Sequence, residues 1–363
     1  MRKLLVVVGT RPNFMKVTQF RRVAQEHGDF AVELVHTGQH TDARMSTVFF
    51  EQFGLVPDHL LEIPHGAGED RIARIMLALD PVLRASKPTA VVVVGDVDST
   101  LAAAITANKL GLPLAHLESG LRSGDREMPE EMNRILTDRI TDLLLVTEPS
   151  GAENLIREGI GEDRIHQVGN TMIDTLVAFD DRIQSSEVLE RLGLGTGGHA
   201  LITIHRPSNV DSMESLARVV DLIAAVAETC KAVFPIHPRT LRGLEASGQI
   251  HRLRESRRVV LCEPLGYFDF QKLLATSSVV ITDSGGVQEE TTFRGIPCLT
   301  LRPSTERPIT ITEGTNELLA FDAGALREAM SLIRSGRFKQ GRVPHLWDGH
   351  ATERVVEALN RAF

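Results

Sequence analysis

Cysteine is scarce in this sequence of 363 residues, which contains only Cys230, Cys262 and Cys298, far apart along the chain. Three thiols cannot form a disulfide framework, and none of them has the spacing that is typical of zinc or redox motifs. We therefore expect reduced thiols, a cytoplasmic location and no bound metal.

Aromatic residues are also few, and long apolar runs and an excess of positive charge are absent. Aromatic side chains are 4% of the residues, so the core must consist mostly of Val, Leu, Ile and Ala. No apolar run reaches the roughly 18 residues that a membrane-spanning helix needs, and the N-terminal segment MRKLLVVVGTRPNF, which has no cleavage site, is interpreted as a strand. Because the net charge is −8, we expect neither nucleic acid nor an anionic membrane as a partner.

Short apolar, β-branched runs alternate with amphipathic segments in the first half of the chain. The runs lie at residues 3–8, 32–37, 90–94 and 143–146. Their alternation with helical segments is typical of βαβ units. Since they are apolar almost throughout, as in parallel strands covered on both faces, the sequence predicts a doubly wound α/β domain.

The same pattern starts again with ALITIH near residue 200 and continues through AVFPIH, RVVLCE, VVITDS and PCLTLR, near residues 232, 259, 279 and 298, so we expect two Rossmann-like halves. We predict an N-terminal domain over residues 1–168, a C-terminal domain over 169–347 and a final helical segment over 348–363 that could pack on either half. Ligands of parallel sheets bind beyond the carboxyl ends of the strands. The site is therefore expected in a cleft between the two halves.

The turn after the first predicted strand carries two cations, Arg11 and Lys16, close to Gly9. A glycine turn at a helix N-terminus with basic side chains can hold an anion, although a tight turn with solvated charges has the same pattern. The GxGxxG motif is absent from this position, which argues against NAD or FAD.

A second candidate anion site follows the apolar run VVIT in the second half. Ser284, Gly285 and Gly286 would open a helix, and the glycines would let backbone N–H groups approach a diphosphate. Glu290 lies about one turn further on, where it could accept hydrogen bonds from a ribose or simply complement the helix dipole. Arg307 could close over the same nucleotide, or could belong to a surface loop.

Three acidic residues of the first half, Asp96, Glu118 and Glu130, lie at predicted strand exits or at a helix start. Each also has a structural explanation, as a helix cap, a hydrogen-bond acceptor or a first-turn acid. Asp96 and Glu118 follow what look like neighbouring parallel strands, so both would face one cleft. His205 follows a strand of the second half, which favours acid–base work or binding of the transferred oxygen.

Several motifs, between about residues 9 and 316, occur together in the order seen in one enzyme family. They are GTRPNFMKV, TGQH, GDVDST, HLESGLRSGDREMPEEMNR, VGNTMID, HRPSN, DSGGVQEE and TERP. In this combination the sequence resembles the non-hydrolysing UDP-N-acetylglucosamine 2-epimerases. The resemblance implies a GT-B fold, with two Rossmann-like domains and the active site between them, and a homodimer.

The resemblance also implies the chemistry. UDP is eliminated from UDP-N-acetylglucosamine to give a 2-acetamidoglucal and is added back with C2 inverted, which forms UDP-N-acetylmannosamine without NAD or metal. A base must remove the C2 proton and an acid must return one on the opposite face. The matching positions imply catalytic roles for Asp96, Glu118, Glu130 and His205, and contacts to the UDP-sugar for Arg11, Lys16, Phe270, Ser284, Gly285, Gly286, Glu290 and Arg307.

Among these contacts, Glu290 would hold the ribose, Arg307 would approach the nucleotide and Phe270 would contact uracil. The chain departs from the family pattern at Asn13, where Glu is frequent, and at Ser119, where Ala is frequent. The residues that follow Gln39-His40 and His237 also differ from members that a second UDP-sugar activates, so allosteric activation stays open.

Four alternatives share parts of this pattern. A GT-B glycosyltransferase would share the fold, and a hydrolysing 2-epimerase would release free N-acetylmannosamine. A 2-epimerase of a modified UDP-N-acetyl sugar would differ in the C3 or C6 substituents. A non-catalytic UDP-sugar-binding module would not need Asp96, Glu118, Glu130 and His205 together, so their joint presence argues against it.

Overall fold

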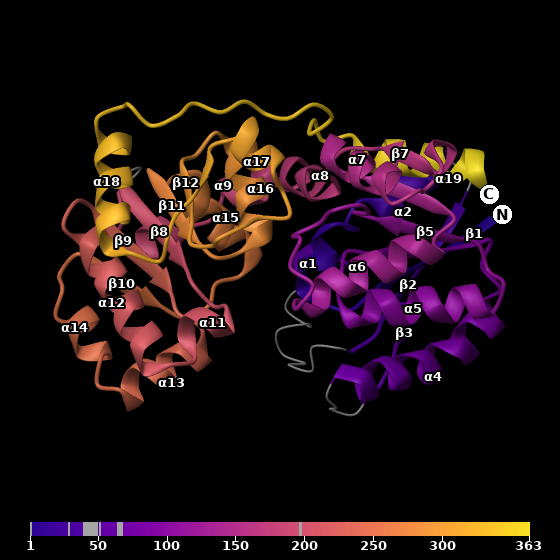
Figure 1. Cartoon of the computed structure of the whole chain (residues 1–363), viewed down its shortest axis with the longest axis horizontal. Coiled ribbons are helices and arrows are strands. Elements are labelled where there is room, and N and C mark those ends of the chain that lie inside the picture. Colours follow the sequence, from indigo (N-terminus) through magenta and orange to yellow (C-terminus); the bar gives the residue numbers. More distant parts are fainter. Residues whose placement is uncertain (1, 28–29, 39–49, 51, 64–67, 196–197) are drawn as a thin grey trace. The chain divides into compact units, whose positions relative to one another are not determined.

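The computed structural model describes residues 2–27, 30–38, 50, 52–63, 68–195 and 198–363. It divides the chain into two compact units (Figure 1). Unit 1 comprises Met1–Ala178 and His345–Phe363, and unit 2 comprises Phe179–Pro344. Gln39, His40 and the two residues after them, which bear on allosteric activation, lie outside the described residues.

Unit 1 contains a seven-stranded sheet in the order β3-β2-β1-β4-β5-β6-β7. All neighbouring strands are parallel, as the unbroken apolar runs predict. The strands are β1 (Arg2–Val8), β2 (Phe30–His36), β3 (His59–Leu60), β4 (Ala90–Val94), β5 (Leu114–Leu117), β6 (Leu143–Val146) and β7 (Ile165–Gln167).

Helices cover both faces of this sheet, with α2 and α19 on one face and α4, α5 and α6 on the other (Figure 1). Side chains of α4 and α5 pack on β1 and β4 in one hydrophobic cluster. The helical segments are α1 (Arg11–Met15), α2 (Phe20–His27), α4 (Gly68–Ser86), α5 (Asp98–Lys109), α6 (Pro129–Ile140), α7 (Pro149–Arg157), the 3-10 turn η1 (Glu162–Arg164), α8 (Thr171–Ala178) and α19 (Ala351–Ala362).

Unit 2 contains a six-stranded parallel sheet in the order β10-β9-β8-β11-β12-β13. The predicted runs near residues 200, 232, 259, 279 and 298 all form strands. The strands are β8 (His199–Thr203), β9 (Lys231–Pro235), β10 (Val259–Cys262), β11 (Val279–Thr282), β12 (Cys298–Thr300) and β13 (Asn316–Leu318).

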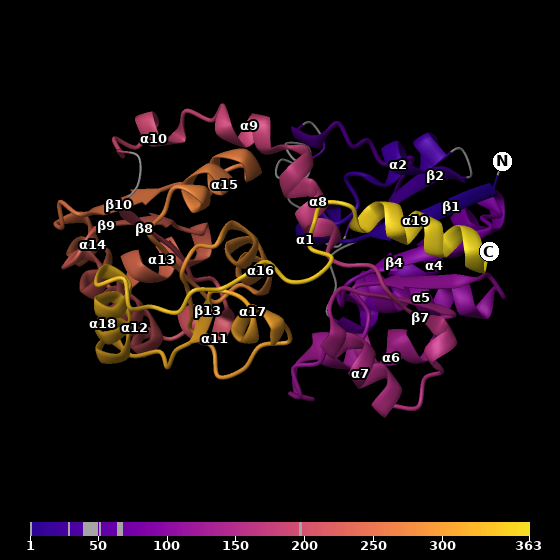
Figure 2. The ribbon, with the colours of Figure 1, turned by 90° about the horizontal axis from the view of Figure 1, so that it is seen from above.

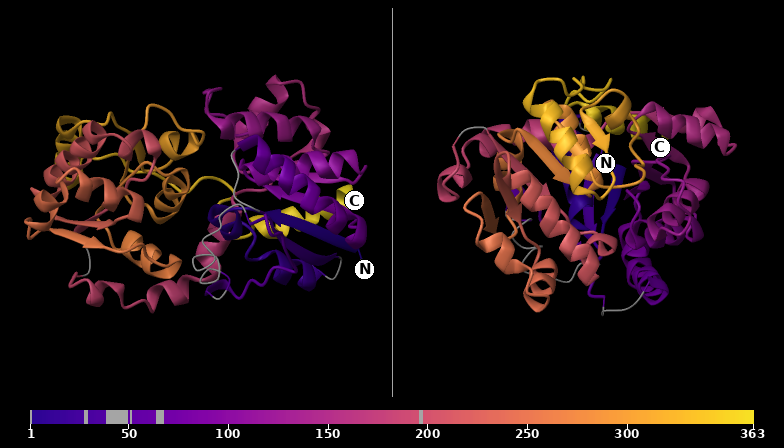
Figure 3. Two further views of the ribbon diagram at one scale, coloured as in Figure 1. Left: turned by 90° about the horizontal axis from the view of Figure 1, so that it is seen from below. Right: turned by 60° about the vertical axis from the view of Figure 1, so that its left-hand side comes forward.

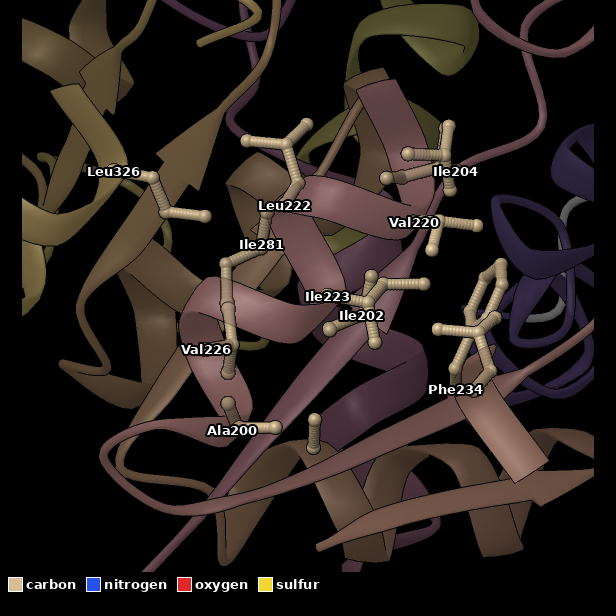
Figure 4. Close-up of a cluster of buried hydrophobic side chains, with 14 of the residues drawn as sticks. Ala200, Ile202, Ile204, Val220, Leu222, Ile223, Val226, Phe234, Ile281 and Leu326 are labelled. Atoms are coloured by element: carbon tan, nitrogen blue, oxygen red, sulfur yellow. The ribbon is translucent and has the colours of Figure 1, made fainter. Parts of the chain in front are cut away.

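The side chains of β8 alternate between two hydrophobic clusters, because successive residues of a strand point to opposite faces. Ala200 and Ile202 pack under α12 and α18 (Figure 4), whereas Leu201 packs against α10, α15 and α16. The helices are α9 (Asp180–Gln184), α10 (Val188–Arg191), α11 (Pro207–Val210), α12 (Met213–Ala227), α13 (Pro238–Ala246), α14 (Ile250–Arg254), α15 (Tyr267–Ala275), α16 (Gly285–Arg294), α17 (Ile309–Thr312) and α18 (Ala323–Arg334).

The division between the units falls after α8, whereas the sequence pattern placed α8 in the C-terminal domain from residue 169 onwards. Helix α8 lies with unit 1 because the Thr175 hydroxyl donates to Met15 O and lies 2.6 Å from Thr18 Oγ1. Hydrogen bonds of this kind depend on tertiary structure, so the sequence pattern does not reveal them.

The last segment of the chain returns to unit 1, where α19 lies beside α2 and α8 (Figure 2). The side chain of Trp347 is buried and donates to Thr147 O at 3.2 Å. Both chain ends lie on unit 1 (Figure 3), and Arg2 donates to Asn360 Oδ1 at 2.7 Å. In the described part of the chain, no helix is long and apolar enough to cross a membrane.

The buried carboxylate of Asp174 joins α8 to the start of α19. It accepts hydrogen bonds from Ala351 N at 3.1 Å, from Thr352 N at 2.5 Å and from the Thr352 hydroxyl at 2.6 Å. These donors would otherwise be unsatisfied at a helix N-terminus.

We expect Asp174→Ala to lower the free energy of unfolding by about 2 kcal/mol, because buried donors lose their acceptor. Urea denaturation followed by circular dichroism measures the change. The control Glu357→Ala, on the exposed face of α19, should change stability by less than about 0.5 kcal/mol. Equal effects of the two variants would contradict this role of Asp174.

Candidate functional site

The first turn of unit 1 is fixed by the buried side chain of Asn13. Its Oδ1 accepts from Gly9 N at 3.2 Å, from Thr10 N at 3.1 Å and from Thr10 Oγ1 at 3.0 Å. Its Nδ2 donates to Val94 O at 3.1 Å, at the end of β4. Asn13 therefore ties the turn after β1 to the exit of the neighbouring strand, while Arg11 is exposed at the start of α1.

The buried side chains of Lys16 and Glu118 form an ion pair at the carboxyl ends of these strands. Both residues were predicted from the sequence as site residues, but their pairing was not. Gly95, at the end of β4, lies close to the pair and has a φ of +68°, which favours glycine; a Cβ there would lie 3.2 Å from Asn13 Nδ2 and 3.3 Å from Glu118 Oε2.

Asp96 follows Gly95 directly and is held by Arg134 of α6. Arg134 donates from Nε at 3.0 Å and from Nη2 at 2.7 Å to the same oxygen, Asp96 Oδ2. The N-cap of the next helix is Val97, so Asp96 is not the helix cap that was its structural explanation. The Asp96 side chain is 29% exposed, which leaves part of the carboxylate accessible to a ligand.

Glu130 and Glu131 lie side by side in the first turn of α6 but differ in their surroundings. Glu131 is buried and accepts from Ser123 N at 2.9 Å and from Gly124 N at 3.0 Å. Burial raises the pKa of Glu131, but these hydrogen bonds and Arg134 lower it overall. Glu130 is partly exposed and makes none of these contacts, so Glu131 is the structural acid of the two and Glu130 the accessible one.

A buried pair that the sequence did not predict joins His116 of β5 to Asp138 of α6. His116 Nδ1 lies 2.6 Å from Asp138 Oδ1, and Arg122 Nη1 lies 2.8 Å from Asp138 Oδ2. Burial alone would raise the pKa of Asp138, but the charges and hydrogen bonds of His116 and Arg122 lower it. Their pairing across 22 positions of sequence is visible only in the structure.

In unit 2, His205 is positioned by another residue that the sequence did not predict, Asp283 at the end of β11. His205 Nδ1 lies 3.1 Å from Asp283 Oδ1. The backbone N–H groups of His205 and Arg206 and the amide of Asn209 also donate to this carboxylate, each within 3.2 Å. Burial raises the pKa of Asp283, but these donors and His205 lower it overall, while the His205 side chain stays 55% exposed.

Helix α16 begins directly after Asp283, with Ser284 at its N-cap and Gly285 as its first residue. A Cβ on Gly285 would lie 2.6 Å from Arg307 Nη1 and 2.8 Å from Glu306 Oε1, so a larger residue there would displace these side chains. The guanidinium of Arg307 therefore lies at the N-terminus of α16, where backbone N–H groups favour an anion.

Arg307 is itself held by two buried carboxylates. Its Nη1 donates to Glu306, and its Nε lies 3.0 Å from Glu289 Oε1. Arg302 contacts the other oxygen of Glu306 at 2.8 Å. This row of alternating charges fixes the direction of Arg307, and its contact with the nucleotide stays a prediction.

The other predicted residues of unit 2 have different surroundings. Ser284 and Gly286 are partly exposed at the start of α16, and Glu290 is buried further along the helix. Phe270 of α15 is partly buried and packs against the hydrophobic cluster that contains Leu201 of β8. Its contact with uracil stays a prediction.

Within the described residues, no three His, Cys, Asp or Glu side chains gather as metal ligands. A cavity of about 400 Å³ in unit 2 is lined by Pro297, Thr315 and Lys339 among others. Pro297 and Thr315 precede β12 and β13, so this cavity lies at the amino ends of the strands, away from His205 and Ser284.

The chain was compared with known proteins. Residues 22–360 match the family model described as UDP-N-acetylglucosamine 2-epimerase. The chain is 38% identical to the UDP-N-acetylglucosamine 2-epimerase of Methanococcus maripaludis over 328 residues, 89% of each chain. It is 37% identical to the UDP-2,3-diacetamido-2,3-dideoxy-D-glucuronate 2-epimerase of Pseudomonas aeruginosa, over 98% of this chain and 99% of that protein.

Among solved structures, the chain resembles Methanocaldococcus jannaschii UDP-GlcNAc 2-epimerase in complex with UDP-GlcNAc and UDP. The TM-score is 0.89 and the identity 35%, with 99% of each chain covered. The architecture of two parallel sheets, each within its own unit, therefore agrees with the GT-B fold that the motifs predicted.

The buried Ser119 hydroxyl has no hydrogen-bond partner among the described residues. We expect Ser119→Ala to raise the free energy of unfolding by about 1 kcal/mol, because an unsatisfied polar group is removed. The control Thr141→Val removes a buried hydroxyl that donates to Thr137 O at 2.7 Å, and should lower stability by about 1 kcal/mol. A clear destabilisation by Ser119→Ala in urea denaturation would show that the hydroxyl does have a partner.

The lowered pKa of Asp283 predicts how acid affects stability. Because the folded-state pKa lies below the ordinary value of about 3.9, the ionised carboxylate stabilises the fold above that pH, and this stabilisation is lost as the pH falls through the folded-state pKa. We expect Asp283→Asn to lose less stability than the wild type when urea midpoints are compared at neutral and acidic pH. Equal losses of stability in both proteins would contradict this role of Asp283. The control is Asp181→Asn, at an exposed position, which should lose as much stability as the wild type.

Proposed function

Because the chain belongs to the UDP-N-acetylglucosamine 2-epimerase family, we propose that it interconverts UDP-N-acetylglucosamine and UDP-N-acetylmannosamine. The observation that carries the proposal is the likeness, over 99% of the chain, to a 2-epimerase structure in complex with UDP-GlcNAc and UDP. The acidic residues that such a reaction needs are present at strand exits and a helix start of unit 1.

The reaction requires no change of oxidation state. A base takes the proton from C2, the electron pair of that bond forms the C1–C2 double bond, and the C1–O bond breaks with its electron pair leaving on UDP. The resulting 2-acetamidoglucal accepts a proton at C2 from the opposite face while a UDP oxygen adds back to C1. An acid and a base on opposite faces of the sugar are therefore needed, and protein side chains commonly serve as both.

We assign the work at C2 to unit 1. Glu118 is held in place by Lys16, and Asp96 is held by Arg134 but keeps 29% of its side chain exposed. Glu130 is partly exposed on the helix that carries Arg134. Two carboxylates with fixed directions and a third that is accessible can supply the base and the acid for the two faces.

We assign the binding of UDP to unit 2. The N-terminus of α16, with Ser284, Gly285 and the guanidinium of Arg307, offers hydrogen-bond donors and positive charge to a diphosphate. These groups would also stabilise the charge that develops on UDP when the C1–O bond breaks. His205, which is exposed and held by Asp283, can donate to the same departing oxygens.

A second substrate is favoured by one observation. The relative from Pseudomonas aeruginosa, named for a diacetamido-glucuronate sugar, matches this chain at 37% identity, close to the 38% of the relative named for UDP-N-acetylglucosamine. The two reactions share the chemistry at C1 and C2 and differ in the substituents at C3 and C6. The homodimer and the cytoplasmic location stay predictions of the sequence.

The proposal is tested by NMR of UDP-N-acetylglucosamine incubated with the protein in D2O. Deuterium at C2 together with signals of UDP-N-acetylmannosamine is the expected result. If UDP-N-acetylglucosamine shows no exchange and the diacetamido-glucuronate sugar exchanges rapidly, the second sugar replaces UDP-N-acetylglucosamine as the proposed substrate. No C2 exchange in either sugar would contradict epimerisation and favour transfer or simple binding.

We expect Asp96→Asn to lower the rate of epimerisation by a factor of about 100 or more, because a carboxylate that moves a proton becomes an amide. UDP affinity, measured by calorimetry, should stay close to that of the wild type, since the UDP groups belong to unit 2. Asp98→Asn, two residues away and paired with Arg71 at 2.9 Å, is the control and should keep most of the activity. Undiminished turnover by Asp96→Asn would remove Asp96 from the mechanism.

A further inference from the structure

The backbone of Glu118 has an unusual conformation for a residue with a side chain. Its φ is +68°, in the left-handed region, where the Cβ of an L-residue is crowded. A conformation of this kind persists only when the surrounding structure enforces it. The groups that hold the backbone on either side of Glu118 therefore decide where its carboxylate lies.

One buried carboxylate, Asp138, holds both sides of this turn. Its Oδ1 lies 2.6 Å from Nδ1 of His116, two residues before Glu118, and its Oδ2 accepts from the backbone N–H of Gly120, two residues after it, at 3.1 Å. Asp138 has no exposed surface. It bridges the turn from the α6 side, so the turn cannot open without breaking one of these bonds.

His116 extends the same support to the neighbouring strand. Its Nε2 lies 2.7 Å from Gly95 O, the carbonyl that directly precedes Asp96. A carbonyl oxygen can only accept, so Nε2 donates to it and Nδ1 faces Asp138. The imidazole therefore connects the turn at Glu118 with the exit of β4, which carries Asp96.

Further contacts limit how far Asp138 can move. Arg122 lies 2.8 Å from Asp138 Oδ2 and binds both oxygens of Glu158, at 2.7 and 2.8 Å. The backbone N–H groups of Glu118 and Ser119 both donate to Leu145 O, at 3.0 and 3.2 Å. The turn is thus fixed by β6 through the backbone and by α6 through a side chain.

We propose that Asp138 and His116 are positioning residues that hold the carboxylate of Glu118, and the strand end that carries Asp96, in the arrangement that proton transfer at C2 requires. Neither residue touches the reacting atoms in this proposal, which rests on the proposed function. Burying the carboxylate of Asp138 this deeply has a large desolvation cost, so its contribution to stability alone does not explain its presence. A role in holding an otherwise unfavourable backbone gives the pair a purpose beyond stability.

Two substitutions of Asp138 separate positioning from folding. Asp138→Asn can keep the bridge, because its amide oxygen accepts from Gly120 N and its NH2 donates to a neutral His116 that still donates to Gly95 O. Asp138→Ala removes the bridge. The matched control is Asp142→Ala, because Asp142 accepts from Leu114 N at 2.9 Å, at the opposite end of the same strand β5.

We expect Asp138→Ala to lower kcat by about 100-fold, since a small misplacement of a catalytic group has an effect of this size. KM and the affinity for UDP should change by less than about threefold, because the UDP groups are untouched. Asp138→Asn should recover at least about a tenth of the wild-type kcat, and Asp142→Ala should keep kcat within about twofold while its melting temperature falls.

A folded Asp138→Ala protein with kcat within about threefold of the wild type would overturn the proposal. If Asp138→Ala does not fold, His116→Asn takes its place, because its shorter side chain loses the link from Nε2 to Gly95 O, and the same limits apply. If the wild type exchanges no C2 proton, the proposed function fails. The positioning role is then decided by the crystal structure of Asp138→Ala, or of the variant that takes its place. A Glu118 φ that leaves the left-handed region supports the role, and an unchanged φ with an intact Lys16 contact overturns it.

Discussion

The left-handed backbone at Glu118 is the constraint on which the candidate catalytic half of this protein depends. It turns the chain sharply at the end of β5 and directs the carboxylate toward Lys16 of the turn after β1. Gly95 lies close to this pair, and the bond from His116 to its carbonyl fixes the start of the loop that carries Asp96. Three neighbouring parallel strands therefore end in one connected polar network.

In unit 2, too, a buried carboxylate holds a candidate site residue in place. Asp283 is buried at the end of β11, and its carboxylate is satisfied by backbone N–H groups of the loop after β8, so that His205 is held while its side chain stays exposed. Arg307 is directed in turn by Glu306 and Glu289. In both units a buried acid therefore fixes the direction of a neighbouring polar group, which is how preorganised sites are built.

The sequence predicted the architecture well because unbroken apolar runs are a strong signal for covered parallel strands. It also predicted that Asp96 and Glu118 follow neighbouring strands, and β4 and β5 are neighbours in the sheet. The short strands β3, β7 and β13, of two or three residues each, were not predicted. Asp138 and Asp283 were missed because their function depends on tertiary contacts, and the domain boundary was placed before α8 for the same reason.

The central proposal is that Glu118, which the fold holds in an unfavourable backbone conformation, is one of the carboxylates that transfer a proton at C2. The most direct test is the rate of C2 deuterium exchange in Glu118→Gln, which keeps the size of the side chain but removes its basicity. We expect exchange to fall by about 100-fold or more while UDP affinity is retained. Exchange at the wild-type rate would show that Glu118 moves no proton and would contradict this assignment.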